Sequence, residues 1–103
     1  MLSANVLAAL NSQIKMEGDS SQVYLAMASW AEVQGFEGIS TFMYNQSDEE
    51  RMHMLKLIKY VNQRGGEAKV GATLEPSLDL TNYKALFKQL LEHEIKVSES
   101  INN

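Results

Sequence analysis

Apolar and polar residues alternate along most of the chain in steps of three and four, which is the period of an amphipathic α-helix. The first such run extends from about residue 4 to residue 33, and the second from about residue 39 to residue 64. A third run begins near residue 81 and continues to residue 103. The pattern therefore predicts an all-α protein in which residues 1–103 form a single domain with three long helices.

Glycine-rich segments mark the connections between these helices. The stretch QGFEG at 34–38 predicts a tight reversal of the chain, and Gly65 and Gly66 are typical of a helix C-terminus. Residues 65–80 form a long connection, which could span about 50 Å when extended, against about 39 Å for a helix of about 26 residues. We therefore expect a crossover that returns the chain to the opposite end, so that the second and third helices run parallel.

Composition narrows the chemistry that this chain can perform. A net charge of −4 gives no basic cluster for nucleic acid or an anionic membrane, and neither partner is expected. Because there is no cysteine, a bound metal would need carboxylate and imidazole ligands. The N-terminal segment carries neither the charge pattern of a signal peptide nor a continuous apolar span, so we expect a cytoplasmic location.

Three glutamates occupy positions at which the helical pattern calls for apolar residues: Glu17, Glu50 and Glu94. A buried carboxylate without a compensating cation is costly, and no lysine or arginine lies close to them on these helical faces. His53 follows Glu50 by three residues and projects from the same helix face, but one imidazolium cannot balance three carboxylates. We infer a metal ion. These ligands suit iron or manganese, zinc is an alternative, and the histidine disfavours calcium.

Each of these residues also has an ordinary structural interpretation. A single glutamate in an apolar seam is more often a boundary residue, and a lone histidine is more often a satisfied core residue. Glu49 points about 100° away from Glu50, which predicts a solvated face. His93 adjoins Glu94 and is expected on another face, exposed to solvent. The ring of Tyr24 should lie in the core, where its hydroxyl needs a polar partner.

Four stretches in this order resemble bacterial non-haem ferritins over essentially the whole chain. They are LSANVLAALNSQIKME leading into Glu17, SSQVYLAMASWAEVQGFEG around Tyr24, SDEERMHMLKLIKYVNQRGG with its Glu-Glu-x-x-His core, and LLEHE ending at Glu94. The resemblance implies a ferritin-like helical bundle that stores iron. It also implies ferroxidase activity, in which a di-iron centre oxidises ferrous to ferric iron with dioxygen or hydrogen peroxide.

The resemblance further implies roles for individual residues. The positions that bind the first iron correspond to Glu17, Glu50 and His53. Glu50 matches the carboxylate that bridges the two irons, and Glu94 matches a ligand of the second. Glu49 matches a position that helps to hold a third, more weakly bound iron in many bacterial members. Tyr24 matches a tyrosine that hydrogen-bonds the site and can give an electron.

Relative to that family, the sequence lacks a fourth helix, which normally supplies further ligands. We therefore expect a homo-oligomer, and either another copy or residues outside this sequence would have to complete the site. One alternative is a self-assembling helical scaffold with a partial metal site and no turnover. A rubrerythrin-like peroxidase is a second alternative, but that class carries a second Glu-x-x-His, and here Val97 follows Glu94 by three residues.

Overall fold

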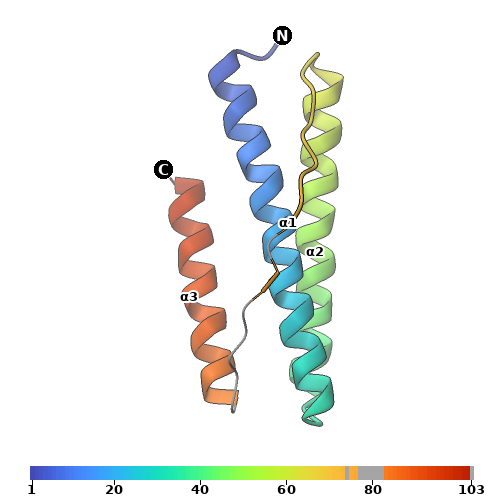
Figure 1. Cartoon of the computed structure of the whole chain (residues 1–103), viewed down its shortest axis with the longest axis vertical. Helices are drawn as coiled ribbons and strands as arrows, with labels where there is room; N and C mark the ends of the chain where they lie inside the picture. Colours follow the sequence, from blue (N-terminus) through green and yellow to red (C-terminus); the bar gives the residue numbers. More distant parts are fainter. Residues whose placement is uncertain (74, 77–82, 103) are drawn as a thin grey trace.

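The computed structural model describes residues 1–73, 75–76 and 83–102, and side chains 83, 86, 94 and 97–102 lie outside the description. Residues 81, 82 and 103 of the expected third helix are likewise outside it. Three helices account for most of the described chain, and Figure 1 shows them: α1 (Ala4–Val33), α2 (Glu37–Gln63) and α3 (Tyr83–Asn102). The described residues contain no strand, and the prediction of an all-α, ferritin-like bundle of three long helices is confirmed.

The helices α1 and α2 are antiparallel neighbours, whereas α3 runs in the same direction as α2 (Figure 1). After α2, residues 65–73 pass back along the α1–α2 pair in the direction of the end at which α3 begins. This is the long crossover that the sequence predicted. Within the described residues, α3 lies against α1, and it does so more sparsely than α2 does.

Glycines in left-handed conformations follow the first two helices. Gly35 and Gly65 have φ angles of 83° and 82°, which a residue with a side chain rarely adopts. The turn after α1 is so tight that α2 begins at Glu37, two residues earlier than the sequence pattern predicted. The length of this turn sets the depth at which residues of α1 and α2 face each other.

The core between the helices is built around a few almost completely buried side chains. Tyr24, Met27, Ala28 and Met43 form its centre, and each is at most 1% exposed. Leu90 of α3 packs against this cluster and so connects the third helix to the α1–α2 pair.

The first part of the crossover is fixed to α1. The Asn11 side chain donates a hydrogen bond to the Glu67 carbonyl oxygen (3.2 Å) and accepts one from the Lys69 N–H (2.8 Å). Further along, a Cβ atom on Gly18 would lie only 3.4 Å from the Thr73 methyl carbon. Met54 Sδ of α2 would lie 3.3 Å from the same Cβ, so glycine at this buried position of α1 leaves room for both the Met54 side chain and the crossover.

A stripe of large apolar side chains remains exposed on α3. Phe87, Leu91 and Ile95 are 47%, 62% and 50% exposed, and their spacing of four residues places them on one helix face. A continuous apolar stripe of this kind is typical of a surface that packs against another helix or another chain. None of the helices in the described ranges has the length and hydropathy needed to cross a membrane.

Candidate metal centre

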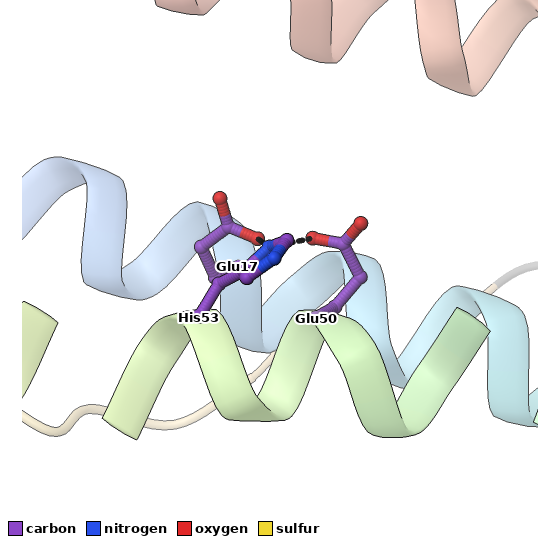
Figure 2. Close-up of side chains that lie close together, drawn as sticks. All are labelled: Glu17, Glu50 and His53. Atoms are coloured by element: carbon purple, nitrogen blue, oxygen red, sulfur yellow. Dashed lines mark ion pairs between the residues drawn. The ribbon is translucent and has the colours of Figure 1, made fainter. Parts of the chain in front are cut away.

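Three side chains from α1 and α2 converge on one point (Figure 2). One ligand atom from each of Glu17, Glu50 and His53 lies within 4.8 Å of the other two. The Nδ1 atom of His53 is 3.7 Å from Glu17 Oε2 and 3.9 Å from Glu50 Oε2, so the imidazole lies between the two carboxylates. The spacing of three residues on α2 places Glu50 and His53 on one face, opposite Glu17.

A pair of serines fixes the register of α1 against α2 one turn away from this point. Ser21 Oγ donates a hydrogen bond to the Ser47 carbonyl oxygen (2.9 Å), and Ser47 Oγ donates one to the Ser21 carbonyl oxygen (2.8 Å). Ser21 follows Glu17 by four residues and Ser47 precedes Glu50 by three, so each serine shares a helix face with one carboxylate. Sequence reasoning missed this pair, although small polar residues on both facing seams were the available signal.

The two carboxylates lie close together in a setting that penalises their charge. Glu17 is 7% exposed; its Oε1 accepts a hydrogen bond from Gln13 Nε2 (2.9 Å), while its buried Oε2 has no hydrogen-bond partner among the described residues. The pKa of Glu50 is raised from 4.5 to about 8, mainly by burial, then by the side chain of Glu17 through hydrogen bonding and charge, and last by the charge of Glu49. In the described part of the chain, no lysine or arginine forms an ion pair with Glu17 or Glu50.

These properties fit the binding of a divalent cation. A cation between the carboxylates would pair with the unsatisfied oxygen of Glu17 and favour the ionised form of Glu50. Carboxylate oxygens and one imidazole nitrogen suit iron, manganese or zinc. The His53 side chain is 56% exposed, whereas that of Glu17 is 8% exposed, so the group has a buried back and a face open to solvent. Three protein ligands would leave coordination positions open for water or a further ligand.

The other predicted site residues are distributed differently. Glu49 is exposed, as its position on the helix predicted, and its charge contributes to the raised pKa of Glu50. Tyr24 is 0% exposed, so its ring lies in the core as predicted, and its hydroxyl has no hydrogen-bond partner among the described residues. The side chain of Glu94 lies outside the described residues, and its role as a ligand stays a prediction.

The prediction that His93 is exposed is wrong. The residue is partly buried, its Nε2 lies 3.1 Å from Ser20 Oγ, and its ring contacts Tyr24. Burial lowers the pKa of His93, and the charge of Lys96 lowers it further. The physical reason is that α3 faces α1 through Leu90 and the residue three positions later, so His93 belongs to the inward face.

Carboxylates and a histidine that project inward from neighbouring long helices are the arrangement found in the metal sites of helical bundles. The chain matches the ferritin-like domain family over residues 7–103, and it belongs to that family. The resemblance to bacterial non-haem ferritins that the sequence suggested is thereby confirmed.

Individual relatives agree with this assignment. The chain is 38% identical over 102 residues to a probable bacterial non-heme ferritin-like protein of Haemophilus influenzae, and 36% identical over 103 residues to a bacterial non-heme ferritin of Staphylococcus aureus. These alignments cover 99% and 100% of this chain, but 62% of each relative. The chain therefore spans less than two thirds of the length of these relatives.

Solved structures give the same result. Chlorobium tepidum ferritin superposes with a TM-score of 0.93 at 32% identity, covering 99% of this chain and 62% of that one. An open-pore ferritin from Archaeoglobus fulgidus superposes with a TM-score of 0.91 at 37% identity, covering 99% of this chain and 63% of that one.

Proposed function

We propose that this chain binds ferrous iron at Glu17, Glu50 and His53 and oxidises it to ferric iron, as part of iron storage. The observation that carries the proposal is a close carboxylate pair with one unsatisfied buried oxygen and a strongly raised pKa at Glu50. Membership of the ferritin-like family supports iron over manganese or zinc as the substrate metal. A cytoplasmic location is part of the same proposal.

Each of the three side chains has its own role in the proposed reaction. Glu17 and His53 would hold the first ferrous ion, and Glu50 would bridge it to a second, as the family resemblance implies. Because the carboxyl of Glu50 is protonated at neutral pH without metal, binding releases its proton to solvent. Carboxylate ligands favour the harder ferric ion, so this ligand set promotes oxidation.

The electron balance requires two ferrous ions for each oxidant molecule. Each ferrous ion loses one electron, and dioxygen takes up two electrons and two protons to give hydrogen peroxide. Hydrogen peroxide as the oxidant takes up two electrons and two protons and gives two water molecules. In both cases the two ferric ions leave the site toward mineral or solution.

The remaining predicted residues extend this scheme. We assign Glu94 to the second iron and Glu49, which is exposed beside Glu50, to a third and weaker one. Tyr24 is the candidate for giving an additional electron. Because the His53 side of the group is open, we expect a homo-oligomer in which another copy, or residues outside this sequence, completes the second iron position.

A second candidate function has its own observation. The exposed apolar stripe of Phe87, Leu91 and Ile95 favours association through α3, independently of metal. In that case the chain would be a self-assembling helical scaffold whose partial metal site does not turn over. Helicity and assembly that depend on protein concentration and ignore metal would favour this function.

The test combines sedimentation with an anaerobic ferrous titration, followed by the addition of oxygen and near-ultraviolet absorbance. We expect a defined oligomer and rapid formation of an oxo-ferric signal, which Glu50→Ala abolishes. Asp48→Ala, which removes an exposed acid from the same helix, should leave that signal intact. Oxidation no faster than in buffer, or equal rates in the parent and Glu50→Ala, would refute ferroxidase activity at this site.

A further inference from the structure

The ring of Tyr24 is held from α3 as well as from its own helix. His93 approaches it in an edge-to-face arrangement, with ring centroids 5.6 Å apart and an angle of 88° between the ring planes. Tyr24 is 0% exposed, so the surrounding side chains set the orientation of its ring. The direction of its hydroxyl, which has no hydrogen-bond partner among the described residues, follows from that orientation.

The imidazole of His93 is itself fixed by a second contact. Its Nε2 lies 3.1 Å from the Oγ of Ser20, which is 1% exposed. Ser20 precedes Tyr24 by four residues, so both lie on the same face of α1. His93 therefore meets α1 at two points one helical turn apart, a polar contact at its nitrogen and a ring contact at Tyr24.

Apolar packing alone does not account for a histidine at this position. Leu90, one turn earlier on α3, already packs against the core cluster that contains Tyr24. A partly buried imidazole costs desolvation energy, and an aliphatic side chain would pack here without that cost. The polar contact with Ser20 and the ring contact with Tyr24 are what the histidine adds.

We propose that His93 is a positioning residue that fixes the ring of Tyr24 relative to Glu17, Glu50 and His53, called the metal group below. Tyr24 follows Glu17 by two helical turns, about 10 Å along α1, so the orientation of its ring decides how its hydroxyl is presented toward the site. His93 is neither a ligand nor an electron donor in this scheme and acts through Tyr24. The inference rests on the proposed function, in which Tyr24 supplies an electron.

The experiment compares His93→Leu, which removes both contacts, with Ser20→Ala, which removes only the polar one. Each is made in the parent and in a Tyr24→Phe background, and Lys88→Gln on the exposed face of α3 is the control. Circular dichroism checks folding, and binding of cobalt alone checks that the metal group is intact. The readouts are the rate of ferrous oxidation and the flipping rate of the Tyr24 ring, measured by NMR with ring-labelled tyrosine and assigned by loss of the signal in Tyr24→Phe.

We expect His93→Leu to accelerate ring flipping and to slow ferrous oxidation about 3- to 10-fold with cobalt binding retained, as for residues that interact directly. Ser20→Ala should change both the flipping rate and the oxidation rate in the same direction, but more weakly. If His93→Leu does not fold, Ser20→Ala is the variant that tests the proposal. In the Tyr24→Phe background the His93 substitution should have no further effect on oxidation. Unchanged ring flipping, or equal slowing in both backgrounds, would overturn the proposal. If the unsubstituted chain binds cobalt but does not oxidise iron, the proposed function is refuted. The flipping rate of the Tyr24 ring would then still show whether His93 fixes that ring.

Discussion

Replacing Glu50 with glutamine should stabilise the metal-free protein at high pH. The folded chain raises the pKa of Glu50 from 4.5 to about 8, through burial and the nearby carboxylates. Below pH 4.5 the carboxyl is mostly neutral in both the folded and the unfolded chain. Between pH 4.5 and 8 the unfolded chain releases the proton and the folded chain keeps it, so stability falls as pH rises, and the loss is complete above about pH 8. Glutamine imitates the neutral carboxyl at every pH and avoids this loss.

The size of the effect follows from the pKa shift. At about 1.4 kcal/mol per pH unit, the shift from 4.5 to about 8 corresponds to ~5 kcal/mol. The Glu50 side chain remains 16% exposed, and solvent screens part of the repulsion. We therefore expect Glu50→Gln to raise the free energy of unfolding at high pH by about 2 kcal/mol. Metal-free Glu50→Gln should therefore unfold at a higher urea concentration than the parent at pH 9, with the difference shrinking toward zero at pH 4. Circular dichroism in the presence of a chelator measures both unfolding curves.

A matched control removes the same charge from the exposed face of the same helix. Asp48→Asn should change the free energy of unfolding by no more than about 0.5 kcal/mol at either pH. Adding a divalent metal should reverse the order, because the parent binds it more tightly than Glu50→Gln and gains more stability. A gain in Glu50→Gln that is equal at pH 4 and pH 9, or no gain at pH 9, would show that the carboxylate pair is not strained.

Two further substitutions test how the helices and the crossover are held. A Cβ at Gly66 would lie 2.9 Å from Leu7 Cδ1, the movable end of a side chain, and 3.3 Å from the Val61 carbonyl oxygen, so Gly66→Ala should destabilise the chain by about 1 kcal/mol in urea unfolding. At Gly71 no described atom lies within 4 Å of the new carbon, so Gly71→Ala should be nearly neutral. Equal effects at the two glycines would contradict this packing. Ser47→Ala, which removes the hydrogen bond to the Ser21 carbonyl oxygen, should cost about 1–2 kcal/mol and weaken cobalt binding in a titration. Unchanged cobalt affinity would mean that the serine pair does not hold the register of the metal group.

The sequence predicted the helices well because their apolar residues recur at the helical period, and Glu17, Glu50 and His53, three of the five predicted ligands, do lie together. Glu50 and His53 are three residues apart, so any helix at that point presents them together. Whether Glu17 reaches them depends on the turn between α1 and α2. Because α2 begins at Glu37, Glu17 and Glu50 lie at depths below the turn that differ by only about 4.5 Å.

The contacts of α3 could not be predicted in the same way. Steps of three and four from Leu90 lead to His93 and to Glu94, and the helical pattern alone does not decide which of them faces α1. Packing against Ser20 and Tyr24 places His93 inward. The small polar residues Ser21 and Ser47 could be read from the sequence, but their reciprocal hydrogen bonds could not, because these depend on the close approach of two helices whose spacing no single-helix pattern specifies.

The two carboxylates and the imidazole of Glu17, Glu50 and His53 are arranged so that a metal ion can replace a proton between them. Anaerobic calorimetric titration with ferrous ion at pH 7, in buffers of different ionisation enthalpy, counts the protons released on binding. We expect release of about one proton as the site fills, because the Glu50 carboxyl is protonated below about pH 8, and loss of that release in Glu50→Gln. Ferrous binding without proton release, or binding that Glu50→Gln leaves unchanged, would contradict it.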